Sequence, residues 1–196
     1  MTGAESTVVA NSFGPSALAT PANAVTMARL ALAPLLCGLI IGVGPSYLTL
    51  APWFVLASTD GVDGWLARRM GTTRSGAFLD PLADKALVLG AMWALVADGG
   101  FWWLPVTLIT GREVGISVFR SYWGRHGLAV PARFWAKVKT VVQSLAVGLA
   151  LIPAVADDHP WVAGGMLWIA VALTLVTGAQ YVLEGSRATA AGGMRA

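Results

Sequence analysis

The sequence predicts an all-α polytopic membrane protein with six transmembrane helices and both termini in the cytoplasm. Of its 196 residues, 56% are hydrophobic and only 12% are charged, and the mean hydropathy is +0.68. Soluble domains have about 25% charged residues, so this composition is typical of a chain that lies mostly within a bilayer. The single cysteine, Cys37, excludes an internal disulfide and a metal cage built from several thiolates.

Six stretches are apolar over the roughly 20 residues that a membrane-spanning helix needs. Short connectors with glycine, proline or aspartate separate them, and these residues favour turns. We expect a mobile segment over residues 1–20, one six-helix domain over residues 21–186 and a C-terminal tail over residues 187–196. The expected segments are Ala24–Val43, Tyr47–Arg68, Ala77–Ala97, Phe101–Tyr122, Phe134–Ala156 and Trp161–Leu183.

The charges between these segments predict the orientation. One set of connectors and tails holds ten basic residues, whereas the opposite set has none and carries Asp98, Asp157 and Asp158. Basic residues near the ends of spans stay on the cytoplasmic side, so we expect both termini there. The basic residues are Arg68, Arg69, Arg74, Arg120, Arg125, Arg133, Lys137, Lys139, Arg187 and Arg195.

Two further features favour a membrane environment. Trp53, Trp102, Trp103 and Trp161 fall near segment ends, where interfacial aromatic side chains are expected. The sequence pI of about 9.4 is explained by the cytoplasmic basic residues and by anionic lipid. We therefore expect membrane lipids as partners and no nucleic acid.

Four aspartates stand at the ends of two apolar segments, Asp60 and Asp63 in the second and Asp80 and Asp84 in the third. The members of the two pairs lie about 60° and about 40° apart around a helix, so each pair shares one face. The short connector makes the two helices antiparallel neighbours, and their faces can converge. Four carboxylates near one point indicate a site for one or two divalent cations, Mg²⁺ or Mn²⁺.

The cost of these carboxylates supports that hypothesis. A carboxylate at membrane depth costs at least ~2.5–3.5 kcal/mol on insertion scales, and a bound cation offsets both this cost and the repulsion within the cluster. A simpler alternative is that Asp80 caps a helix that begins at Pro81. In that case Asp84 pairs with Lys85 or Arg68.

Small residues lie on the same face as the first aspartates. Gly64 lies about 40° from Asp60 around the helix and Ala67 about 20° on its other side, which leaves room for a flat ligand. The alternative explanation for both is close packing of helices. Arg68 adds a positive charge that is well placed for a phosphate.

Together these residues resemble the signature of the CDP-alcohol phosphatidyltransferases, D-x2-D-G-x2-A-R followed, after seven or eight residues, by G-x3-D-x3-D. The chain matches all eight fixed positions, with seven residues between Arg68 and Gly76. Members of this family transfer the phosphatidyl group of CDP-diacylglycerol to an alcohol and release CMP, and they are usually homodimers. The resemblance implies metal binding by Asp60, Asp63, Asp80 and Asp84.

The resemblance also implies roles for individual residues. Asp84 is the expected catalytic base as well as a metal ligand. The residues expected to bind CDP-diacylglycerol are Asn23, Thr26, Asp60, Gly64, Ala67, Arg68, Arg74 and Gly76.

Three further motifs bear on the acceptor alcohol: NAVTMAR at residues 23–29, a stretch with Arg-Glu at residues 111–127, and AKVKTVVQ at residues 136–143. They resemble the bacterial members of the family that make phosphatidylglycerophosphate, although Ala136 replaces the glycine of the third motif. The simplest alternative for the first motif is an Asn23 cap with Arg29 at the membrane edge. The resemblance implies glycerol 3-phosphate as the acceptor.

The phosphate of that acceptor needs a basic pocket. Glu113 is expected to be a poor partner for Arg112, because adjacent helix residues point about 100° apart. The alternative role for the two lysines of the third motif is anchoring at the cytoplasmic interface. The residues expected to form the pocket are Arg112, Arg120, Lys137 and Lys139.

Two alternatives to this function remain open. Within the family, the acceptor could be inositol phosphate or phosphatidylglycerol. Outside it, the carboxylates could line the path of a divalent-cation transporter. A transporter is expected to bind its ion near the middle of the bilayer, whereas these carboxylates lie at the cytoplasmic ends of their helices.

Overall fold

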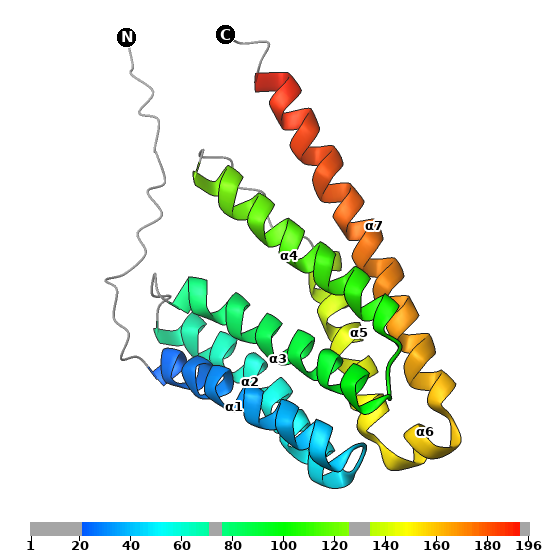
Figure 1. Ribbon diagram of the computed structural model, residues 1–196. Helices are drawn as coiled ribbons and strands as arrows, with labels where there is room; N and C mark the ends of the chain where they lie inside the picture. Colours follow the sequence, from blue (N-terminus) through cyan, green and yellow to red (C-terminus); the bar gives the residue numbers. More distant parts are fainter. Residues whose placement is uncertain (1–20, 71–75, 126–133, 193–196) are drawn as a thin grey trace, which may run out of the picture.

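The part of the chain that the structure describes forms six long helices and one short helix (Figure 1). This computed structural model describes the backbone of residues 21–70, 76–125 and 134–192, and the side-chain surroundings of residues 24–59, 81–118 and 138–179. No strand occurs in that backbone, so the predicted all-α class is confirmed. The helices are α1 (Pro21–Val43), α2 (Tyr47–Met70), α3 (Gly76–Asp98), α4 (Trp103–Arg125), α5 (Phe134–Leu151), α6 (Pro153–Asp158) and α7 (Pro160–Gly192).

Two of these helices are long and apolar enough to cross a membrane, α1 through Ala24–Val43 and α7 through Pro160–Ala179. Shorter apolar stretches occupy Tyr47–Thr59 of α2 and Val138–Leu151 of α5. Large apolar side chains on several helices are exposed, Leu35, Val118 and Trp161 among them. Such an outer surface is consistent with a helical membrane protein. The six spans and the orientation of the termini stay predictions.

The fifth expected segment, Phe134–Ala156, is wrong as one continuous helix. α5 ends at Leu151, Ile152 is extended with φ −75° and ψ 118°, and α6 begins at Pro153. Proline has no N–H to donate and disfavours helical backbone in the residue before it, which explains the break. α7 in turn continues beyond the expected end at Leu183 and includes residues 187–192 of the expected tail.

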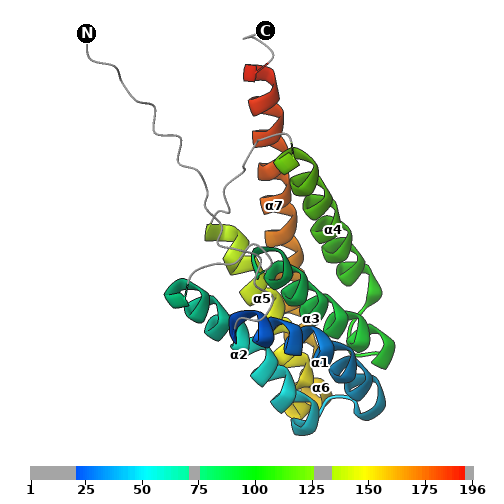
Figure 2. The same cartoon turned by 90° about the vertical axis from the view of Figure 1, so that its left-hand side faces the viewer.

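The helices pack in two groups that α2 and α3 join. α1 packs against α2 and α3, while α7 packs against α4 and α5. α3 also contacts α4 and α5, and α2 contacts α5, so both helices link the two groups. Figure 2 shows α2 and α4 at opposite edges of this arrangement. The largest fully buried apolar side chains of the shared core are Ile40, Leu87, Met92, Leu95, Val106, Ile109, Val147, Leu151 and Leu167.

The prediction that Trp53 lies at the membrane interface is wrong. Its side chain is only 3% exposed and faces α5. Gly148 makes this possible, because a Cβ atom at that position would lie 3.4 Å from the indole nitrogen. By contrast, Trp102, Trp103 and Trp161 are exposed near helix ends, as the sequence predicts.

The connectors after α1, α3 and α5 gather at one end of the bundle, at the lower right of Figure 1. Gly44 adopts a positive φ of 73°, and a Cβ atom there would lie 3.4 Å from Asp98 Oδ1. The first and second of these connectors are therefore close neighbours. Because each long helix reverses direction, the basic ends of α2 and α4 and the basic start of α5 lie at the opposite end.

Candidate active site

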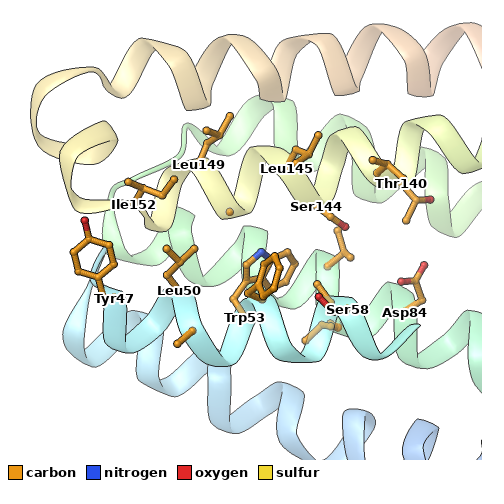
Figure 3. Close-up of a pocket in the computed structure, with 17 residues that line it drawn as sticks. Tyr47, Leu50, Trp53, Ser58, Asp84, Thr140, Ser144, Leu145, Leu149 and Ile152 are labelled. Carbon is orange, nitrogen blue, oxygen red and sulfur yellow. The ribbon is translucent and has the colours of Figure 1, made fainter. Parts of the chain in front are cut away.

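A cavity of about 790 Å³ lies among α2, α3 and α5 (Figure 3). This volume is within the range of about 300–1,000 Å³ that is usual for ligand pockets. Its walls are mainly apolar and include Leu50, Trp53, Leu87, Leu145 and Leu149. The cavity can therefore hold an apolar ligand.

Polar side chains gather at one end of this cavity. Figure 3 shows Asp84 and Thr140 there, with Ser58 and Ser144 nearby, whereas Tyr47 and Ile152 line the other end. Ser58 and Asp84 belong to α2 and α3, the two helices that carry the aspartate signature. The cavity thus leads from an apolar end to the part of the fold where the signature begins.

Asp84 is the one predicted metal ligand whose side chain the structure describes. It is half-buried, about two turns after the start of α3. The α2 backbone remains helical from Ser58 through Asp63, so Asp60 follows the cavity-lining serine by about half a turn and Asp63 by about one and a half turns. A carboxylate among hydroxyl groups is a set of hard oxygen donors and fits Mg²⁺ or Mn²⁺.

Most other predicted site residues lie outside the side chains that the structure describes. Within the described set, no group of three His, Cys, Asp or Glu residues gathers. Thr26 is described, and it is buried together with Arg29 on one face of α1, each about 1% exposed. The Arg29 side chain is thus packed inside the protein. The residues outside the described set are Asn23, Asp60, Asp63, Gly64, Ala67, Arg68, Arg74, Gly76, Asp80, Arg120 and Lys137.

A second polar centre surrounds the buried carboxylate of Glu113. Its Oε1 atom accepts a hydrogen bond from Arg112 Nη1 at 3.0 Å and another from Lys139 Nζ. Lys85 Nζ lies 3.9 Å from the other carboxylate oxygen. The side chains of Glu113, Arg112 and Lys139 are only 7%, 9% and 7% exposed, whereas Lys85 is 35% exposed. Three cations from α3, α4 and α5 therefore meet at one carboxylate.

Further contacts fix this centre in place. Arg112 Nη2 donates to Thr177 Oγ1 of α7 at 3.0 Å. Ser117 Oγ donates to the backbone oxygen of Glu113 at 2.6 Å and accepts from Lys85 Nζ. α7 also comes very close at Gly178, where a Cβ atom would lie 3.1 Å from Arg112 Nε. Four helices thus contribute to one network.

The prediction that Glu113 is a poor partner for Arg112 is wrong. Their Cβ atoms do point in different directions, but a long arginine side chain can bend back, and the two meet where Lys139 arrives from α5. The structure does bring Arg112 and Lys139 together, as the sequence predicts. Sequence reasoning missed Glu113, Lys85 and Thr177. For Glu113 a signal existed, since an acidic residue within an apolar helix is costly unless it has a partner.

Comparison with known proteins shows to which protein family this chain belongs. Residues 19–176 match the family model of the CDP-alcohol phosphatidyltransferases. This chain belongs to that family and is therefore a transferase.

Its relatives narrow the class further. A Mycobacterium tuberculosis protein named "Probable phosphatidylglycerophosphate synthase" is 38% identical over 89% of this chain and 85% of its own length. The Pseudomonas fluorescens protein named CDP-diacylglycerol–glycerol-3-phosphate 3-phosphatidyltransferase is 36% identical over 82% of this chain and 87% of its own length. A Bacillus subtilis protein of that same name is 36% identical over 81% and 91%.

Proposed function

We propose that this protein transfers the phosphatidyl group of CDP-diacylglycerol to glycerol 3-phosphate. The products are phosphatidylglycerophosphate and CMP, and the reaction belongs to phospholipid biosynthesis. The observation that carries this proposal is similarity along most of the chain to proteins named for that reaction. The cavity beside Asp84 and the cation cluster at Glu113 supply matching features for a lipid donor and an anionic acceptor.

The donor fits the cavity by chemistry. CDP-diacylglycerol has two apolar acyl chains and a strongly polar diphosphate head. The cavity is apolar at the Tyr47 end and polar at the Asp84 end, so it can take an acyl chain with the head group near the signature. We expect the head group to bind residues of the signature and of the first motif, namely Asn23, Thr26, Asp60, Gly64, Ala67, Arg68, Arg74 and Gly76.

The acceptor fits the cation cluster. Arg112 and Lys139 converge on one point although they come from different helices. A guanidinium fork and an ammonium group together suit a phosphate with several acceptor oxygens. We propose that Arg112, Arg120, Lys137 and Lys139 bind the phosphate of glycerol 3-phosphate.

The chemical step follows from these placements. Asp84 takes the proton of the acceptor hydroxyl, and that oxygen attacks the phosphorus on the lipid side of the diphosphate. The bond between this phosphorus and the bridging oxygen breaks, and CMP leaves with that oxygen. We propose that Asp60, Asp63, Asp80 and Asp84 hold one or two divalent cations, Mg²⁺ or Mn²⁺. Such cations would neutralise the diphosphate and the leaving group.

The charge pattern is the basis for our proposal on the membrane location and on the side of the active site. One end of the bundle carries the basic helix ends and the signature, while the other end exposes Asp98, Asp157 and Asp158. This pattern supports six spans in the cell (inner) membrane, with both termini and the active site on the cytoplasmic side. We also expect a homodimer.

The test is a comparison of acceptors. The purified full chain in detergent is given CDP-diacylglycerol and Mg²⁺ with glycerol 3-phosphate, inositol phosphate, phosphatidylglycerol or no acceptor, and CMP is measured. We expect release to depend on glycerol 3-phosphate. CMP release that depends on either of the other alcohols would agree with the family but contradict glycerol 3-phosphate as the acceptor.

A further inference from the structure

We infer that Glu113 and Thr177 are positioning residues that assemble Arg112, Lys139 and Lys85 into one cluster for the acceptor phosphate. This inference rests on the proposed acceptor, glycerol 3-phosphate. Neither residue needs to touch the substrate, since each acts through the cations that it holds. Three observations support it: the net charge of the cluster, the hydrogen bonds that Arg112 makes on two sides, and the position of Lys85 next to Asp84.

The charge of the cluster suits a phosphate monoester. Three cations surround one carboxylate, so these four side chains together carry a net charge of +2. A phosphate monoester carries about −1.5 to −2 at pH 7. Glu113 thus lets three mutually repelling cations converge, and these four side chains together still carry a charge opposite to that of the acceptor phosphate.

Arg112 is held from two sides. Its Nη1 atom donates to Glu113 Oε1 and its Nη2 atom donates to Thr177 Oγ1, both at 3.0 Å. The hydroxyl group of Thr177 in turn bonds to the backbone oxygen of Leu173 at 2.7 Å, which fixes its orientation. Gly178 allows α7 to pack directly on this side chain. A guanidinium held in this way has lost its freedom before the phosphate arrives, and such positioning lowers the cost of binding and of reaction.

Lys85 connects the cluster to the proposed base. It follows Asp84 on α3, and its Nζ atom bonds to Ser117 Oγ and lies 3.9 Å from Glu113 Oε2. α4 is therefore tied to the helix that carries the proposed base. An acceptor whose phosphate binds at the cluster would have its hydroxyl group at a constant distance from Asp84.

α7 offers a matched pair of threonines for the test. Thr177 accepts a hydrogen bond from Arg112, whereas Thr174, one turn earlier, accepts one from Gln143 of α5 at 3.1 Å. Both threonines are buried and both link α7 to another helix. Thr174 contacts neither the cations nor Glu113 through these bonds, so Thr174→Val controls for the loss of a buried interhelical hydrogen bond.

The experiment is steady-state kinetics of the full chain in detergent with each substrate varied in turn. We expect Thr177→Val to raise the apparent KM for glycerol 3-phosphate by about 3–10-fold, the size of one typical net hydrogen bond, because Thr177 acts on the phosphate only through Arg112. The KM for CDP-diacylglycerol should change by less than about 2-fold in the same variant. Thr177→Ser, which keeps the hydroxyl group, should restore the wild-type KM, and Thr174→Val should leave it unchanged while lowering the melting temperature.

Glu113→Gln supplies a second, independent variant. Glutamine keeps an oxygen that accepts hydrogen bonds but has no charge, so the three cations repel one another and the bond that holds Arg112 on this side becomes weaker. We therefore expect the KM for glycerol 3-phosphate to rise at least ~10-fold, again without a matching change for CDP-diacylglycerol. If this variant does not fold, the comparison of Thr177→Val with Thr174→Val still tests the inference.

The outcomes separate this inference from the proposed function. If the wild type uses glycerol 3-phosphate but Thr177→Val behaves like Thr174→Val, or weakens both substrates equally, the positioning role is overturned and the function stands. If the wild type does not use glycerol 3-phosphate at all, the proposed function and the inference that rests on it are overturned together.

Discussion

Arg112 Nη1 lies 3.0 Å from Glu113 Oε1, and these two neighbouring residues of α4 have side chains that are only 9% and 7% exposed. Either charge alone at membrane depth would be costly. Removing one partner of such a pair leaves the other uncompensated, and in buried pairs this costs about 3–5 kcal/mol. A substitution at either residue therefore changes stability as well as binding, and the two effects have to be measured separately.

Replacing the cations of this cluster should weaken the binding of the acceptor more than that of the donor. Arg112→Ala or Lys139→Ala should raise the apparent KM for glycerol 3-phosphate by about 10–100-fold, because each removes a charge-assisted hydrogen bond to the phosphate. The KM for CDP-diacylglycerol should change far less. Steady-state kinetics test this, with the melting temperature of each variant recorded beside them. Equal losses for both substrates would mean that these residues hold only the fold or the nucleotide.

Asp84→Asn should abolish the base and keep the shape of the side chain. We expect the transfer rate to fall at least ~10²-fold, which is the lower end of general-base effects. Binding of CDP-diacylglycerol should largely survive. Asp98→Asn, an exposed aspartate at the opposite end of the bundle, is the control and should have near-normal activity. Near-normal turnover of Asp84→Asn would contradict the assignment of the base.

Activity should depend completely on a divalent cation. Four clustered carboxylates would have no counter-charge without it, and the diphosphate of the donor would not be activated. CMP release should therefore stop in EDTA and return when Mg²⁺ or Mn²⁺ is added in excess. Full CMP release in EDTA would refute the metal site.

The contact between α1 and α3 should tolerate no larger side chain at Gly90. A Cβ atom there would lie 3.0 Å from Cys37 Sγ, and overpacking of this kind typically costs about 1–3 kcal/mol. Gly90→Val should therefore lower the melting temperature in detergent, and Cys37→Ala in the same chain should recover part of the loss. Gly38→Val is the control, because a Cβ atom at Gly38 has no other atom within 4 Å. A Gly90→Val protein as stable as the control would contradict this packing.

Sequence patterns predicted the helices well because each has its own local cause. Apolar length and turn residues determine where a helix can lie, and four of the six expected segments correspond to α1, α2, α3 and α4. The break at Ile152 also has a local cause in Pro153, but the apolar run continues across it and hides it. Trp53 could not be placed from the sequence, since its burial depends on Gly148, which is far away in the chain.

The candidate site likewise contains residues that local sequence patterns indicate and residues whose contacts depend on distant parts of the chain. The sequence singles out Asp84 because the signature carries it at a fixed spacing, and Arg112 and Lys139 because the phosphate of the expected acceptor needs a basic pocket. The structure brings Arg112 and Lys139 to one carboxylate, while the roles of all three residues stay predictions. The position of Glu113 in an apolar helix indicates that this carboxylate has a partner. Which cations it binds could not be predicted, because they come from three helices whose packing no local pattern predicts. The angle between neighbouring helix residues predicts where their Cβ atoms point. It does not predict that a long side chain such as that of Arg112 can bend back to Glu113. Thr177 has no local signal at all, since only the packing of α7 on α4 makes it a partner of Arg112.

The most direct test of the central claim is to follow the acceptor into lipid. Radiolabelled glycerol 3-phosphate is incubated with CDP-diacylglycerol, Mg²⁺ and the wild-type chain, and the label in the organic phase is compared with the CMP formed. Transfer to glycerol 3-phosphate predicts equimolar labelled lipid and CMP, with both lost in Asp84→Asn. CMP release without label in the lipid would contradict the account.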